Sequence, residues 1–187
     1  MICIMPENIK KIEIFGANHF ETFSKTRAGS RAVVVRDETI LLSHETQSGW
    51  WLVPGGGIEE GETPEACCVR EAEEETGNLV LPLQEFTTVF EYYEEYRYIT
   101  HYFICEVTGS GRIHLTEAET RRGAEPEWIL LSEAIDIFSH HQSYGGINEE
   151  KRGIYLREYT ALKEYLRFSN DDEVWKEKEF IDEQIKN

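Results

Sequence analysis

The sequence predicts an α/β (α+β) fold in which a mixed β-sheet is flanked by helices. Apolar runs of strand length precede and follow one central helical segment, and a second stretch of helical periodicity comes last. No linker and no internal repeat divides the 187 residues. We therefore expect a single domain over residues 1–168. The acidic residues 169–187 are expected to form a further helix or a disordered tail.

The first third of the chain is expected to form strands joined by turns. Alternating apolar and polar residues predict an edge strand at 11–16, whereas 17–30 are expected to be a loop or a weak strand. Residues 31–44 predict a hairpin with its turn at 37–39. A short apolar strand at 50–53 is then ended by a proline and three glycines, which predict a loop.

A helix is predicted from Pro64 to Thr76. Thr63 is a good N-cap, and proline is well placed as the first helical residue because it needs no hydrogen-bond acceptor there. Gly77 is expected to end the helix, since glycine readily adopts the left-handed conformation.

The remainder is expected to hold two long strands, a polar irregular stretch, a short strand and two helices. In chain order these elements are expected at residues 85–93, 98–107, 109–127, 128–131, 133–138 and 149–168. Ser132 is expected to cap the first of the two helices. The apolar spacing of the last helix is more typical of core packing than of an interface.

The charge of the chain restricts its partners. Acidic residues number 36 and basic residues 19, for a formal net charge of −17. Long nucleic acid and anionic membranes are not expected to bind, because both attract lysine and arginine. Small phosphate ligands remain compatible if a divalent cation lies between them and the carboxylates.

Cysteine usage and hydropathy indicate a cytoplasmic protein. The four cysteines lack the spacing of a zinc site, and a reduced compartment accounts for them. The apolar runs are too short to span a membrane, and no secretory signal is evident at the N-terminus.

Three glutamates are expected on one side of the 64–76 helix. Glu71, Glu74 and Glu75 occupy positions i, i+3 and i+4, within an arc of about 100°. Such neighbours repel by on the order of 0.2–0.5 kcal/mol per pair. By themselves the glutamates favour a solvated acidic face over a cation site. The glycines at 55–57 and the adjacent Arg70 favour the cation site, since backbone can approach a ligand there and Arg70 can orient a carboxylate.

The segment from Gly56 to Gly77 resembles the Nudix box, G-x5-E-x7-R-E-U-x-E-E-x-G-U, in which U is apolar. Every fixed glycine, glutamate and arginine is present, and Asn78 departs from the final apolar position. The resemblance to this MutT-like family implies a Nudix-like α/β/α sandwich that binds Mg²⁺ or Mn²⁺. It also implies a metal-dependent hydrolase that cleaves the pyrophosphate linkage of a nucleoside diphosphate linked to a group X.

The resemblance also implies site residues. Glu74 and Glu75 would be the principal metal ligands, Glu71 a further ligand or a base, and the Gly55 carbonyl a backbone ligand. Arg70 would belong to the catalytic residues by orienting the carboxylates, and Glu62 would have a structural or orienting role.

Many members of the family take the general base from a loop outside the box. The candidates here are Glu117, Glu119, Glu125 and Glu127, in the stretch expected to be irregular. We favour Glu125, because it is expected in a loop shortly before a strand; an ordinary surface glutamate is the alternative for each.

Other features leave alternatives open. Tyr92, Tyr93, Tyr96, Tyr98 and Tyr102 crowd the two long strands; they could stack a nucleobase, but strand packing is the expected role. Trp175, Phe180 and Ile181 could mediate a homodimer. A nucleotide-sensing module without turnover, or a different reaction on a diphosphate substrate, would also fit this fold.

Overall fold

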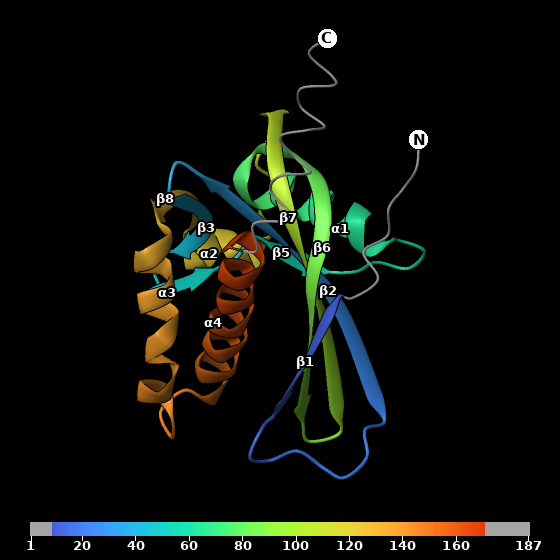
Figure 1. Ribbon diagram of the computed structural model, residues 1–187. Coiled ribbons are helices and arrows are strands. Elements are labelled where there is room, and N and C mark those ends of the chain that lie inside the picture. Colours follow the sequence, from blue (N-terminus) through green and yellow to red (C-terminus); the bar gives the residue numbers. More distant parts are fainter. Residues whose placement is uncertain (1–8, 171–187) are drawn as a thin grey trace.

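The computed structural model describes residues 9–170 and confirms a mixed β-sheet flanked by helices (Figure 1). Its strands are β1 (Lys10–Phe15), β2 (Lys25–Arg36), β3 (Thr39–Glu45), β4 (Trp50–Leu52), β5 (Gly55–Gly57), β6 (Asn78–Tyr93), β7 (Tyr96–Ser110) and β8 (Ala124–Leu130). Its helices are α1 (Pro64–Thr76), α2 (Glu117–Arg122), α3 (Leu131–Ser139), the 3₁₀ helix η1 (His140–Tyr144) and α4 (Glu149–Asn170). The proposed dimer contacts at Trp175, Phe180 and Ile181 lie outside the described residues.

The sheet has eight strands and carries helices on both faces. The strand order is β1-β6-β7-β2-β3-β4, with β5 paired to β2 and β8 paired to β3. β1 runs parallel to β6 and β2 runs parallel to β7, whereas β6 and β7 are antiparallel. α1 lies on one side of the sheet and α3 and α4 on the other (Figure 1). Within residues 9–170, no helix is long and apolar enough to cross a membrane.

Strand β2 contributes to two separate cores because successive side chains of a strand point to opposite faces. Ala32 and Val34 pack with Cys68 and Ala72 of α1. Val33 belongs to the larger core beneath α3 and α4. The residues of α1 that contact the sheet are small and fully buried, so this helix lies close to the strands.

The predicted hairpin joins β2 to β3 through a two-residue turn at Asp37 and Glu38. Both residues have positive φ, 48° and 64°, and Arg36 pairs with Thr39 across the turn. Two positive φ angles in a two-residue loop match the right-handed twist of the flanking strands. Thr39, expected in the turn, is instead the first residue of the returning strand.

Strand pairing also forms where the sequence predicts a loop. β2 begins at Lys25, so the expected loop or weak strand over 17–30 ends earlier, because parallel pairing with β7 runs from Lys25 to Val34. The expected glycine loop at 55–57 also forms a short strand, since Gly55, Gly56 and Gly57 pair with β2. In both cases the pairing comes from a strand distant in sequence, which local periodicity does not reveal.

The stretch expected to be irregular over 109–127 contains regular structure. Thr116 and Glu119 form a capping box that starts α2, and Gly123 ends this helix with a φ of 69°. β8 starts at Ala124, before the predicted strand at 128–131. The expected Ser132 cap is also wrong, because α3 starts at Leu131 without a side-chain cap.

Replacing Glu38 with glycine is expected to stabilise the protein. Positive φ strains a residue with a side chain, and glycine removes that strain at the cost of a more flexible unfolded chain. We expect a gain of about 0.5–1 kcal/mol, or roughly 1–4 °C in Tm, measured by thermal unfolding. Glu38→Ala keeps the strain and is the matched control; an equal gain in both variants would contradict this account.

Candidate active site

Helix α1 forms over the predicted residues and presents its glutamates toward the glycine strand β5. The Thr63 hydroxyl accepts a hydrogen bond from the Ala66 amide at 3.2 Å, and Gly77 ends the helix with a φ of 68°. Because both ends are fixed by their own residues, the helical phase of the glutamates is fixed as well.

Glu75 is the most buried of these glutamates, with 7% of its surface exposed. One of its carboxylate oxygens accepts a hydrogen bond from the Gly55 amide at 3.1 Å. Burial raises the pKa of Glu75 to about 8, although Arg31 and the Gly55 amide oppose the rise. The buried surroundings of Glu75 therefore favour either its neutral carboxyl form or a carboxylate whose charge is compensated by a nearby cation.

Arg70 holds the other carboxylates in place. Its Nη1 donates to Glu71 Oε1 at 2.7 Å and to Glu74 Oε2 at 3.1 Å. Its Nε and Nη2 donate to the two carboxylate oxygens of Glu62 at 2.8 Å and 2.9 Å, and Nη2 also donates to the Gly57 carbonyl. The hydrogen bond from Arg70 lowers the pKa of Glu62 to about 2. The Arg70 guanidinium thus joins Gly57 of β5, Glu62 before the helix, and the two helix glutamates Glu71 and Glu74.

Two of the glycines are required by close contacts. A Cβ on Gly56 would overlap the carboxylate of Glu71, and Gly55 has a φ of 145° and lies against the Ser30 carbonyl and Arg31. A Cβ on Gly57 would meet no atom within 4 Å. The loop therefore lets the backbone approach the glutamates at Gly55 and Gly56, as expected for a cation site.

The Gly55 carbonyl, expected to be a metal ligand, already accepts a hydrogen bond. Arg31 Nη1 donates to this oxygen at 2.5 Å and to the Val53 carbonyl at 2.8 Å. A carbonyl oxygen has two lone pairs, so one remains for a cation. Arg31 also places a fixed positive charge beside the box, where it opposes the burial-driven rise in the pKa of Glu71.

The donor set of the box fits a hard divalent cation, because all of its side-chain donors are carboxylate oxygens. Glu71 and Glu74 already share one hydrogen-bond donor, and Glu75 lies one residue further along the helix. Within residues 9–170, however, the three do not form a group with ligand atoms within 4.8 Å of one another. Arg70 Nη1 lies between Glu71 and Glu74, and the Gly55 amide holds Glu75, so the side chains would have to rotate to place their oxygens around one cation.

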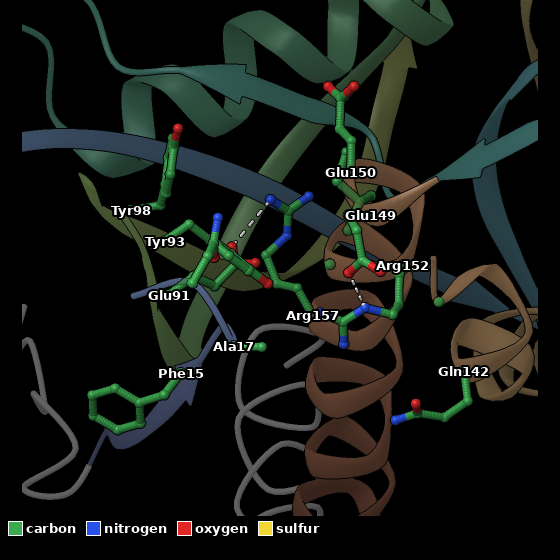
Figure 2. A pocket seen from close by; sticks show the side chains of 14 residues that line it. Phe15, Ala17, Glu91, Tyr93, Tyr98, Gln142, Glu149, Glu150, Arg152 and Arg157 are labelled. Atoms are coloured by element: carbon green, nitrogen blue, oxygen red, sulfur yellow. Dashed lines mark hydrogen bonds and ion pairs between the residues drawn. The ribbon is translucent and has the colours of Figure 1, made fainter. Parts of the chain in front are cut away.

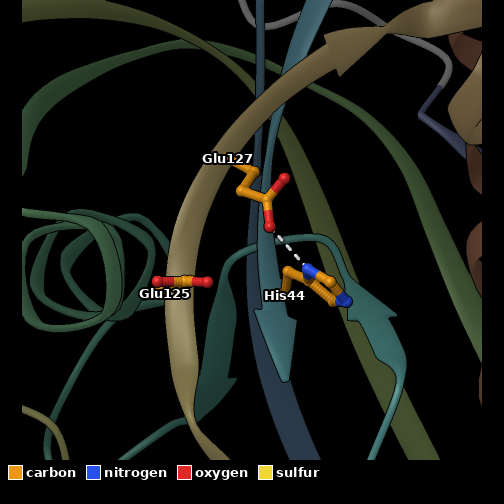
Figure 3. A group of neighbouring side chains, drawn as sticks. All are labelled: His44, Glu125 and Glu127. Carbon is orange, nitrogen blue, oxygen red and sulfur yellow. Dashed lines mark hydrogen bonds and ion pairs between the residues drawn. The ribbon is translucent and has the colours of Figure 1, made fainter. Parts of the chain in front are cut away.

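A different group does meet that distance: His44, Glu125 and Glu127 (Figure 3). His44 Nδ1 lies 2.5 Å from Glu127 Oε1, and the His44 ring stacks on Trp51 with a centroid distance of 3.8 Å. Its imidazole makes the group better suited to transition metals than to Mg²⁺. His44 is not predictable as a site residue from the sequence, because only the β3–β8 pairing brings it opposite Glu125.

The four candidate bases lie in regular structure. Glu125, expected in a loop, is an exposed residue of β8, and Glu127 is a partly buried residue of the same strand. Glu117 and Glu119 belong to α2. The charge of Glu119 contributes to the raised pKa of Glu75, after burial, so this residue lies near the box. The Glu119 carboxylate also accepts a hydrogen bond from the Thr116 amide at 2.7 Å.

Known proteins resemble this chain in sequence and in fold. The family model described as NUDIX domain matches residues 25–149. Diphosphoinositol polyphosphate phosphohydrolase 3-alpha of Mus musculus is 32% identical over 106 residues, covering 57% of this chain and 63% of the relative. Diphosphoinositol polyphosphate phosphohydrolase 2 of Homo sapiens is 28% identical over 134 residues, covering 68% and 72%. The chain thus spans less than two thirds of the first relative.

Among solved structures, a NUDIX hydrolase from Nitrosomonas europaea has a TM-score of 0.50 and 19% identity. The match covers 73% of this chain and 90% of that protein. At this identity the likeness shows the fold alone.

Gly56→Ala is expected to weaken cation binding while leaving the protein folded. The added methyl group must displace the Glu71 carboxylate, which is the flexible end of its side chain. We expect at least a tenfold loss in Mn²⁺ affinity, about 1.4 kcal/mol, measured by calorimetric titration. Gly57→Ala adds the same methyl group to open space and is the matched control. Wild-type Mn²⁺ affinity in Gly56→Ala would contradict the proposed cradle.

Proposed function

Because this chain belongs to the NUDIX domain family, we propose that it is a Mg²⁺- or Mn²⁺-dependent hydrolase of nucleoside diphosphate derivatives. The bond broken is the phosphoanhydride of the diphosphate. The observation that carries this proposal is that Glu71 and Glu75 of α1 contact the glycine strand, while Arg70 joins that strand to the helix.

The relatives support the type of bond attacked. Both are named as phosphohydrolases of diphosphoinositol polyphosphates, and a diphosphate group contains a phosphoanhydride. The names do not carry the rest of the substrate to this chain, because fold and family are shared across many substrates.

We propose that Glu74, Glu75 and the Gly55 carbonyl hold the cation, with Glu71 as a further ligand or base. A bound Mg²⁺ or Mn²⁺ would neutralise charge on the diphosphate and acidify water. Arg70 then serves as a positioning residue, since it contacts the carboxylates rather than the reacting atoms. The burial of Glu75 disfavours a charged side chain there until a cation compensates it.

We propose Glu125 as the general base that removes a proton from the attacking water. Its exposed position on β8 leaves the carboxylate open to solvent and substrate. His44 and Glu127 lie beside it, with ligand atoms of all three residues within 4.8 Å of one another.

Hydrolysis is best tested with a substrate panel and one glutamate exchange. The panel comprises ADP-ribose, NADH, nucleotide sugars, dinucleoside polyphosphates and oxidised deoxynucleoside triphosphates, each with Mg²⁺ or Mn²⁺. We expect turnover of at least one member, and a kcat lower by about 100-fold or more in Glu74→Gln. Glu73→Gln removes the same charge from a neighbouring position of the helix and is expected to change kcat less than twofold.

The opposite outcomes would overturn the assignment. Wild-type turnover in Glu74→Gln would contradict the role given to this residue. Nucleotide binding by calorimetry without turnover of any panel member would favour the sensing module instead.

A further inference from the structure

A cavity of about 940 Å³ lies between β6, β7 and α4, on the face of the sheet opposite α1 (Figure 2). β6 contributes Glu91 and Tyr93 to its lining, β7 contributes Tyr98, and the start of α4 contributes acidic and basic side chains. A cavity of this size can hold a small organic molecule. Neither the box glutamates nor the glycine strand lines it, so it is a site separate from the box.

The guanidinium groups of the lining are already paired with carboxylates. Arg152 donates to Glu149 at 2.5 Å. Arg157 is shared by two buried carboxylates, because it donates to Glu158 at 2.7 Å and to Glu91 at 3.4 Å. At this side of the cavity one positive charge therefore serves two negative charges, which is an unfavourable balance for buried groups.

The start of α4 adds a further negative charge without a positive one. Glu150 lines the cavity and takes part in none of these ion pairs. Lys151, the next residue, is not part of the lining. Its ammonium group donates to the Gly49 carbonyl at 3.0 Å and lies 4.6 Å from the centre of the Tyr144 ring. The described lining thus has a surplus of negative charge that no side chain of α4 removes.

Aromatic rings lie beside these carboxylates. The ring centroids of Tyr93 and Tyr98 are 6.4 Å apart. Burial raises the pKa of Tyr98, and the charge of Arg27 opposes this rise. The charges of Glu91 and Glu150 add to the rise, so both carboxylates lie near enough to act on the Tyr98 ring. A cation over the face of this ring is therefore attracted by the ring and by the carboxylates together.

A polar group of the lining also lacks a partner. The hydroxyl of Tyr93 is buried and has no hydrogen-bond partner among residues 9–170. A Cβ at Gly153 would lie 2.7 Å from this oxygen, so the hydroxyl meets α4 at a position that offers no side chain to it. Buried polar groups are usually hydrogen-bonded. A ligand that donates an N–H or O–H group beside the Tyr93 ring can supply the missing bond.

The spacing of the carboxylates favours an organic cation over a metal ion. Among the described residues, Glu91, Glu149 and Glu150 do not form a group whose ligand atoms lie within 4.8 Å of one another. A hard metal ion needs its oxygen ligands at about 2.0–2.6 Å, so it cannot use these three together. An organic ammonium ion spreads its contacts over a larger molecule, and its alkyl groups can lie against tyrosine rings.

We propose that this cavity binds a small organic ammonium ion, with its positive charge beside Tyr98 and directed toward Glu91 and Glu150. This binding site is independent of the proposed diphosphate hydrolysis, and the tests below use no diphosphate. It also gives Tyr93 and Tyr98 a role besides strand packing.

Charged probes and their neutral counterparts test the requirement for a cation. Choline is compared with its neutral isostere, in which carbon replaces the quaternary nitrogen, and butylammonium is compared with butanol. Each is titrated into the full chain and followed by ligand-observed NMR. We expect at least one cation to bind with a Kd of about 1 mM or tighter, and its neutral counterpart to bind about tenfold more weakly or less. Failure of both cations to bind, or equal binding of the neutral counterparts, would overturn the proposal.

Charge and ring variants locate the bound cation. Glu150→Gln should weaken binding about fivefold and Tyr98→Ala about tenfold, whereas Tyr98→Phe keeps the ring and should stay within about twofold. Glu106→Gln removes the same charge at an exposed position near the far end of β7 and should leave binding unchanged. Equal losses in Glu150→Gln and Glu106→Gln would reduce the effect to net charge and overturn the assignment to this cavity.

Discussion

The site depends on keeping three like-charged glutamates together at the end of one helix. Neither the repulsion between Glu71, Glu74 and Glu75 nor the helix dipole favours that arrangement. The structure offsets the repulsion with Arg70, which contacts two of them, and with the Gly55 amide, which contacts the third. The Gly55 contact needs the glycine strand to lie close to the helix, and a methyl group at Gly56 would displace the Glu71 carboxylate.

The central strand β2 connects the box to the rest of the molecule. Its pairing with β5 positions the glycines, and its pairing with β7 joins them to the centre of the sheet. The side chains of Ala32 and Val34 pack under α1, whereas Arg31 and Val33 belong to the opposite face. One strand therefore supports α1 on one side and the larger core beneath α3 and α4 on the other.

Local signals were enough to predict the helix and the hairpin. Thr63, Pro64 and Gly77 define α1 by themselves, and Asp37 and Glu38 lie where the turn was expected. Features that depend on distant pairing were not predictable. Glu125 was expected in a loop because residues 109–127 are polar and irregular in pattern, yet pairing with β3 makes it part of β8 beside His44. The partners of Arg31 are likewise fixed only by the folded sheet.

The most direct test of the cradle is the position of a bound cation. Crystals soaked with Mn²⁺ and measured by anomalous diffraction would show it without reference to any substrate. The account predicts a peak among the carboxylates of Glu71, Glu74 and Glu75, near the Gly55 carbonyl. A peak confined to His44, Glu125 and Glu127, with none at the box, would contradict it.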